Sequence, residues 1–403
     1  MENSFQSEAA NKKNPKWENL IKREKPLYGR NNDIRSEFAR DYTRIIHSNA
    51  YRRLKHKTQV FFSPKNDHIC TRIEHVNHVE SISYTIANYL GLNTELTKSI
   101  SVAHDLGHAP FGHKGENVLS EISKRDVGIP FWHEKNGLHF VDDIELLEDD
   151  ERNKQNLNLT YAVRDGIISH CGEINENGLK PRKEAINLIK YNRPNQFAPY
   201  TWEACIVKIS DNISYIGRDI EDAISIGILN DKKLQELSEI LEDGEGKTIN
   251  NTIVINNLIN DLCMNSNPEK GLMFSEHAYH MLKAIKKFNY ENIYAAPKLL
   301  PSIQYFELVI HQIYETLKQA YDGKNTLKKL KKLEKQYPYV VQSFLGWIDY
   351  YWDLTDRSRT NYKNRIIYNV SENEKDYYKA IIDYISGMTD NYAIEIYNDI
   401  ISF

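Results

Sequence analysis

The chain has 403 residues, of which 27% are charged and 40% are hydrophobic, a composition typical of a globular protein with at least one full core. Lys and Arg (52) against Asp and Glu (56) give a formal net charge of −4, which argues against a coat protein for nucleic acid but leaves a local anion pocket open. Four cysteines without a CxxC pair, the absence of an apolar run of roughly 20 residues and a polar N-terminus predict a cytoplasmic protein with reduced thiols and no membrane span.

Apolar residues recur mostly at helical spacing along the chain. One helical face is predicted over 36–54, a second from His75 to Leu90 with Gly91 as its C-cap, and a third starting at Asn93 or Thr94. The strand-like stretch 59–62, followed by turn residues 63–67, predicts a short β-hairpin between the first two helices. Residues 125–160 are predicted as loop with short helices, and helical patterns return at 201–242 and from 250 onward. The pattern favours one mostly α-helical unit with a helical C-terminal extension.

Histidines are concentrated in one part of the chain. Ten of the 14 lie between residues 47 and 139, and the densest run is HDLGHAPFGHKGE at 104–116. The adjacent His104 and Asp105 offer a nitrogen and an oxygen ligand to a divalent cation. Neighbouring helical residues point about 100° apart, so further ligands must come from other helices, with His75 and Asp211 as candidates. Taken alone, the His104-Asp105 doublet has an alternative interpretation, a buried histidine that is hydrogen-bonded to a neighbour. Packing, however, does not require the histidines at 108 and 113 in the turn that follows.

The order His75, His104-Asp105, Asp211 resembles the H…HD…D signature of the HD-domain metal phosphohydrolases. Longer matches are similar to the deoxynucleoside triphosphate triphosphohydrolase (dGTPase-like) branch and run in its order over about residues 35–393: RRLxxKTQ (52–59), TRxxH (71–75), HDxGHxPFGHxGE (104–116), DNISY (211–215) followed by Arg218-Asp219, and DYISGMTD (383–390). We therefore predict an all-α fold with an HD-domain core (26–245) that contains a short β-hairpin. A flexible N-terminal segment (1–25) precedes it, and a helical C-terminal extension (246–403) completes the pocket and supplies oligomer contacts.

The resemblance implies a metal site formed by His75, His104, Asp105 and Asp211. Two neutral imidazoles and two carboxylates would balance a divalent charge and leave positions for water and a phosphate oxygen. Mn, Mg and Fe all suit this ligand set. One departure is His78, which stands where relatives often carry an acidic residue, and it leaves the metal preference open.

The resemblance also implies the groups for proton transfer. His113 and Glu116 lie one helical turn apart and match a catalytic histidine and its acidic partner, since a carboxylate on one ring nitrogen fixes the tautomer. Whether His113 acts as base, acid or nucleophile is open. The alternative interpretation is that His113 and Glu116 are an ordinary pair of side chains on the surface of a helix. His133 matches another active-site histidine.

Four further residues match substrate-binding positions. Arg72 matches a phosphate-contacting arginine. Tyr215, one turn after Asp211, can close off C2′ of a deoxyribose, although a core aromatic is its alternative interpretation. Gln59 and Asp219 match residues that hydrogen-bond the 3′-hydroxyl. A buried polar pair of this kind weakens the binding of a nucleotide that lacks the 3′-hydroxyl.

The resemblance as a whole implies a metal-dependent dNTP triphosphohydrolase. Metal-activated water would attack the α-phosphorus of dGTP or another dNTP and release deoxynucleoside and inorganic triphosphate. One alternative is an HD phosphodiesterase that acts on another nucleotide. The sequence argues against it, because HDLGHA stands where such an enzyme would carry HDxxED. A second alternative is a non-hydrolytic nucleotide sensor. Relatives imply a homo-oligomer and a dNTP activator, whereas the net charge does not support nucleic-acid binding and the base preference is open.

Overall fold

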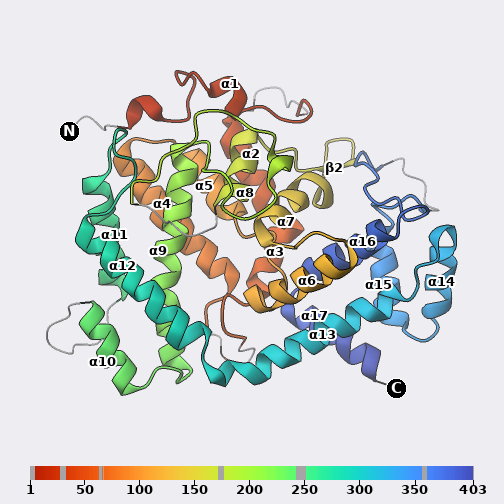
Figure 1. Cartoon of the computed structure of the whole chain (residues 1–403). Helices are drawn as coiled ribbons and strands as arrows, with labels where there is room; N and C mark the ends of the chain where they lie inside the picture. The colour runs from red at the N-terminus through yellow and green to blue at the C-terminus, as the bar shows by residue number, and fades with distance from the viewer. Residues whose placement is uncertain are drawn as a thin grey trace.

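The protein is described by a computed structural model over residues 5–27, 33–62, 66, 68–170, 177–241, 251–355 and 361–402. It is an all-α protein with one two-stranded β-hairpin in these ranges, as predicted (Figure 1). The elements of the N-terminal part are α1 (Trp17–Leu20), α2 (Glu37–Ile46), α3 (Asn49–Arg53), α4 (Arg72–Leu90), α5 (Thr94–Ala103), α6 (Gly112–Asp126), α7 (His133–His139), β1 (Leu146–Glu148), β2 (Lys154–Asn156), α8 (Tyr161–Ser169), α9 (Trp202–Ser225) and α10 (Asp231–Ile240). Those of the C-terminal part are α11 (Asn251–Asn265), α12 (Glu276–Asn289), α13 (Leu300–Lys318), α14 (Thr326–Leu333), α15 (Pro338–Ile348), α16 (Glu374–Ser386) and α17 (Asp390–Ile401).

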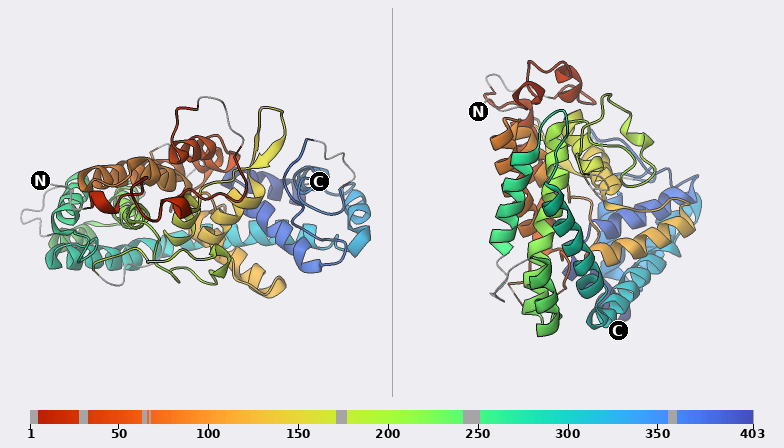
Figure 2. Two further views of the ribbon diagram at one scale, coloured as in Figure 1. Left: turned by 90° about the horizontal axis from the view of Figure 1, so that it is seen from above. Right: turned by 60° about the vertical axis from the view of Figure 1, so that its left-hand side comes forward.

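Two hydrophobic clusters hold the described chain together. One joins α2, α5, α6 and α8 to α13–α17, and the other joins α4, α9, α11 and α12. Helix α15 packs against α14, α16 and α17, and α13 carries the chain across to α6, α16 and α17 (Figures 1 and 2). Helix α4 belongs to both clusters, because Val76 and Val79 pack in the first and Ile82 and Ile86 in the second. Helix α9 is shared in the same way, so a site between α4 and α9 lies where the two cores meet.

The predicted end of α4 and the predicted start of α5 are confirmed. Thr71 and Glu74 form a capping box at the start of α4, and Gly91 ends the helix with φ of 78°. Asn93 caps α5 by accepting hydrogen bonds from the backbone N–H groups of residues 95 and 96. The continuous helical face over 36–54 is interrupted, since α2 ends at Ile46 and Ser48 caps a separate α3.

The β-hairpin lies elsewhere than predicted. Residues 59–62 form no strand, residues 63–65 and 67 fall outside the described residues, and the local pairing is a single bridge between Thr58 and Thr71. The hairpin is β1 with β2, inside the 125–160 stretch predicted as loop, and Leu147 stands opposite Gln155 in its antiparallel register.

The described residues of the N-terminal segment pack on the core. Phe5 is fully buried against Trp202, with ring centroids 4.9 Å apart. The backbone N–H of Ala10 donates to Glu203, whose carboxylate is buried, at 2.9 Å. Burial of Phe5 and this buried hydrogen bond fix the segment over the start of α9. None of the helices in the described ranges combines the length and the apolar character that a membrane crossing requires.

Candidate metal centre and active site

The predicted metal ligands come from three helices that meet between the two cores. His75 lies on α4, His104 and Asp105 follow the end of α5, and Asp211 lies near the middle of α9. One ligand atom from each of His75, His104 and Asp211 lies within 4.8 Å of the others. The Nε2 atom of His75 is 3.0 Å from an oxygen of Asp211, and the Nε2 of His104 is 3.4 Å from Asp105 and 3.9 Å from Asp211. The structure therefore brings the predicted set together.

The tautomer of His104 fits a metal ligand. Its Nδ1 lies 2.6 Å from the carbonyl oxygen of Ser101, and because a carbonyl only accepts, Nδ1 carries the hydrogen. The Nε2 of the neutral ring then presents a lone pair to the cluster. That atom is buried and has no hydrogen-bond partner among the described residues. A buried nitrogen lone pair without a partner, beside two carboxylates, is the donor set that a divalent cation requires.

Asp105 connects the metal ligands to the rest of the site. The buried guanidinium of Arg72 donates to it at 2.8 Å, and the Nε2 of His108 lies 3.1 Å from its other oxygen. Burial opposes ionisation, yet His104, His108 and Arg72 hold the pKa of Asp105 well below its ordinary value. Arg72, predicted to contact phosphate, is therefore bound to a ligand carboxylate here and also donates to the backbone carbonyl of Gln59.

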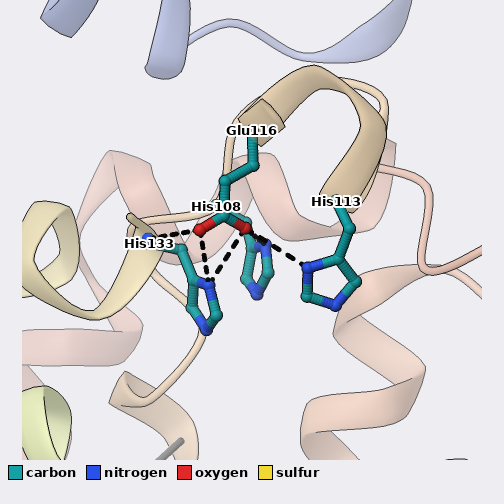
Figure 3. Close-up of side chains that lie close together, drawn as sticks. All are labelled: His108, His113, Glu116 and His133. Atoms are coloured by element: carbon teal, nitrogen blue, oxygen red, sulfur yellow. Dashed lines mark hydrogen bonds and ion pairs between the residues drawn. The ribbon is translucent and has the colours of Figure 1, made fainter. Parts of the chain in front are cut away.

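Glu116 holds the predicted proton-transfer residues in a second cluster beside the first (Figure 3). Its carboxylate is 3.3 Å from the Nδ1 of His113 and 3.1 Å from the Nδ1 of His133, and it accepts a hydrogen bond from the backbone N–H of His133 at 2.9 Å. Burial opposes ionisation, but His133 and His113 hold the pKa of Glu116 well below its ordinary value. The side chain of His113 is 63% exposed, so its ring can reach a ligand while Glu116 fixes its orientation.

Two further histidines belong to the site, although the sequence motif did not assign them a role. His108 stacks on His133 with ring centroids 3.7 Å apart and contacts Asp105, so it links the two clusters. Burial, Arg72 and His133 hold the pKa of His108 well below its ordinary value, which keeps this ring neutral. His170, after α8, groups with His104 and Asp105, and burial lowers its pKa to about 3. The run 104–116 contained His108, whereas no spacing in the sequence pointed to His170.

A strained turn aims His113 at the site. Phe111 has φ of 64°, a left-handed conformation that is uncommon for a residue with a side chain, and Gly112 follows with φ of 60°. The carboxylate of Asp390, at the start of α17, accepts hydrogen bonds from the backbone N–H groups of Phe111 at 2.8 Å and Thr58 at 2.7 Å. The ring of Phe111 stacks on Phe306 of α13 at 4.3 Å. Contacts from the C-terminal helices thus stabilise the left-handed turn that leads into α6 and sets the position of His113.

Gly107 sets the spacing between the HD turn and α7. A Cβ atom there would lie 2.1 Å from both the backbone nitrogen of Gly137 and the carbonyl oxygen of His133. We expect Gly107→Ala to destabilise the fold by about 3 kcal/mol, because backbone on both sides cannot yield to the methyl group. Urea unfolding followed by circular dichroism measures this, with Gly346→Ala in α15 as the control. Gly346 has nothing within 4 Å, so its substitution should stabilise by about 0.5–1 kcal/mol. Equal stability of Gly107→Ala and the wild type would contradict the close approach.

The predicted sugar-binding residues line up along α9 and reach α12. The hydroxyl of Tyr215 donates to Asn212 at 3.3 Å, and Asp219, one turn further on, accepts from the hydroxyl of Tyr294 at 2.5 Å. The buried Oε1 of Gln59 has no partner within the described ranges. Lys286 of α12 donates to Asn212, next to the ligand Asp211. Lys286 and Tyr294 were missed by the sequence analysis, although both lie in a segment that follows the helical pattern of the extension.

His78, the residue that departs from the family pattern, lies outside the ligand groups. Its side chain is exposed on α4. Partial desolvation by the surrounding protein, together with the charge of Arg218, lowers the pKa of its imidazole. The groups of metal-compatible side chains found among the described residues do not include it. His78 is therefore not an additional ligand in this arrangement.

Comparison with known proteins agrees with this geometry. The HD domain matches residues 72–216, and the phosphohydrolase-associated domain matches residues 348–399. The deoxyguanosinetriphosphate triphosphohydrolase-like protein of Caldanaerobacter subterraneus subsp. tengcongensis is 34% identical over 369 residues, covering 91% of this chain and 86% of its own. Proteins of the same name are 32% identical in Desulfatibacillum aliphaticivorans, with 91% and 88% covered, and 33% identical in Rickettsia prowazekii, with 94% of each chain covered. The chain therefore belongs to the deoxyguanosinetriphosphate triphosphohydrolase-like family of HD-domain phosphohydrolases.

Proposed function

We propose that the protein is a metal-dependent dNTP triphosphohydrolase, which cleaves a dNTP to deoxynucleoside and inorganic triphosphate. The observation that carries the proposal is the link through His108 between the metal-compatible group and the Glu116 cluster. Phosphoester hydrolysis needs both a cation near the phosphate oxygens and a group that transfers a proton. The names of the relatives support a deoxynucleotide as the substrate.

We propose that His75, His104, Asp105 and Asp211 hold the divalent ion. When bound, the ion would supply Lewis acidity toward a phosphate oxygen and toward the attacking water. The side chains contribute the geometry: Ser101 fixes the tautomer of His104, and Asp211 keeps its charge because His75 holds its pKa below the ordinary value against the effect of burial.

The remaining roles follow from position and charge. We assign proton exchange with the substrate to the Nε2 of His113, because Glu116 occupies its Nδ1. His133 is oriented by the same carboxylate and lies beside it (Figure 3). Arg72 brings positive charge next to the ligand Asp105, and Lys286 brings it next to Asn212, the neighbour of Asp211, which suits a triphosphate. Tyr215 would exclude a 2′-hydroxyl, while Gln59 and Asp219 would bind the 3′-hydroxyl.

The test is a product assay on the full-length protein. The protein is incubated with each dNTP and each rNTP, singly and mixed, with Mn²⁺ or Mg²⁺, and the products are separated by chromatography. We expect deoxynucleoside and inorganic triphosphate from at least one dNTP and no cleavage of rNTPs. Intact dNTPs in every mixture would refute the proposal and favour a nucleotide sensor, whereas monophosphate with pyrophosphate would identify a different phosphohydrolase.

Lys286→Ala should raise KM for the dNTP roughly tenfold and change kcat little, because one charge-assisted contact to the phosphates is lost in the ground and transition states alike. The matched control is Lys287→Ala, since the neighbouring side chain is 75% exposed and pairs with Glu291 only at 3.9 Å. Steady-state kinetics on both variants separate the two parameters. A KM unchanged in Lys286→Ala would exclude phosphate binding by this lysine.

Asp219 should make substrate binding depend on pH. Burial raises its pKa to about 7, against the hydrogen bond from Tyr294, so the carboxylate form predominates above pH 7 and the protonated form below. The carboxylate is the stronger acceptor for a 3′-hydroxyl, so KM should be roughly tenfold lower at pH 8 than at pH 6. In Asp219→Asn this ratio should fall toward one, because the amide does not titrate. The same pH ratio in variant and wild type would assign the titration to another group.

Assembly and regulation belong to the same proposal. We infer a cytoplasmic homo-oligomer that dNTPs can activate, as the family resemblance of the sequence implies. Light scattering on the purified protein gives the oligomeric state, and a rate that rises only in dNTP mixtures would reveal activation.

A further inference from the structure

A cavity of about 520 Å³ lies against α7. Its wall is formed by the N-terminal segment, the 127–132 linker, α7, α8, the 186–189 loop and α16. The catalytic candidates His113, Glu116 and His133 do not line it. Its volume falls within the range of small-molecule sites.

The wall is apolar with one unusual polar atom. Phe131, Leu138, Ile168 and Leu188 supply aliphatic and aromatic surface, and Trp132 is 94% buried beside them. The indole N–H of Trp132 is buried and has no hydrogen-bond partner among the described residues. Because a buried donor without an acceptor costs free energy, an acceptor supplied by a ligand would satisfy it.

The unpaired charge in the cavity is positive. Each of the four carboxylates on the wall is engaged: Glu24 and Asp142 with Arg164, Asp143 with Arg365, and Asp383 with His139. The ammonium group of Lys135 lies 4.8 Å from the ring of Trp132. Lys379 of α16 forms no hydrogen bond or ion pair with the part of the chain that the structure describes. Lys135 and Lys379 both line the cavity, and Lys135 also donates to the backbone carbonyl of Tyr191 at 3.2 Å. After burial, the charge of Lys379 is the second cause of the lowered pKa of Lys135.

We propose that this cavity binds a small organic anion with an aromatic body. The acidic group would lie between Lys135 and Lys379, the body would pack on the apolar wall, and an acceptor would meet the indole N–H of Trp132. This goes beyond the proposed hydrolysis, since binding here needs neither metal nor dNTP. Trp132 is the N-cap of α7 and directly precedes His133, so an occupant that contacts Trp132 touches the neighbour of a catalytic candidate.

The probe is 8-anilino-1-naphthalenesulfonate, an aromatic sulfonate whose fluorescence rises in apolar surroundings. Titration of the full-length protein should give one saturable site, and Lys379→Glu should weaken its affinity roughly tenfold or more. Ile189→Glu places a negative charge at the mouth of the cavity on a side chain that is 79% exposed, so it should weaken binding without affecting folding. Lys328→Glu, the same charge change on the exposed face of α14, is the matched control and should bind like the wild type.

A second readout locates the probe. The chain has five tryptophans, so a protein labelled with 5-fluorotryptophan gives a small set of 19F signals, and Trp132→Phe identifies the one from Trp132. That signal should shift during the titration while the others stay in place. Equal probe affinity in Lys379→Glu, Ile189→Glu and the control, or a Trp132 signal that does not move, would overturn the proposal whether or not the protein hydrolyses dNTPs.

Discussion

Replacing Asp211 by Asn should leave the purified protein without its divalent metal and lower dNTP hydrolysis by about 1000-fold or more, since Lewis-acid assistance supplies several kcal/mol. The reason is that Asp211 gives the group its nearest carboxylate, 3.0 Å from the Nε2 of His75, while the amide carries no charge. The loss should persist when Mn²⁺ is added in excess, because the site itself is incomplete.

Two measurements separate this outcome from simple unfolding. Elemental analysis gives the metal content, and thermal unfolding with and without Mn²⁺ reports binding, since an ion that binds only the native state raises the Tm. The wild type should show the shift and Asp211→Asn should not. Asp231→Asn, the same change on the exposed first turn of α10, should behave like the wild type. Full metal content with normal turnover in Asp211→Asn would refute the assignment of the site.

His113→Ala should keep the metal and lose roughly 100- to 10,000-fold in kcat, the usual size of a proton-transfer contribution. The ring is largely exposed, and within the described residues its hydrogen bond is the one from Nδ1 to Glu116, so its removal leaves no cavity and should cost little stability. Normal metal content combined with low kcat therefore distinguishes this variant from Asp211→Asn.

The control for this prediction is His280→Ala on the exposed face of α12, which should retain full activity. A further comparison is Glu116→Gln, because that carboxylate holds both His113 and the backbone of His133. If the pair acts as a unit, combining Glu116→Gln with His113→Ala should cost little more than His113→Ala alone. Additive losses would show that Glu116 acts mainly through His133.

The sequence predicted those features that depend on local chemistry. The predicted caps at Gly91 and Asn93 are examples, because backbone freedom or a side chain acts there within a few residues of the helix end. The hairpin was misplaced because its three-residue strands, LLE and KQN, lack alternating β-branched residues, whereas the apolar stretch 59–62 has a strand-like composition but no neighbouring strand in the described residues.

The candidate site divides in the same way. The motif resemblance named the four metal ligands and the His113–Glu116 pair, and the structure places them together. His170, Lys286 and Tyr294 reach the site because α8, α12 and the helical turn 290–294 after α12 pack against α9. Tyr294 and Asp219 are 75 residues apart in the chain. No periodicity relates positions so far apart, so only the folded arrangement could reveal them.

The bond from Phe111 to Asp390 has a consequence for how the protein is made. The two residues are 279 positions apart in the chain, so a ribosome that has just completed the histidine-rich run has not yet produced the carboxylate that holds its left-handed turn. A nascent chain can bury much of the α4, α5 and α9 core before then, but its His113 begins from a strained backbone without that support. The active site can therefore reach its final geometry only after α17 has been synthesised and has packed against the rest of the protein.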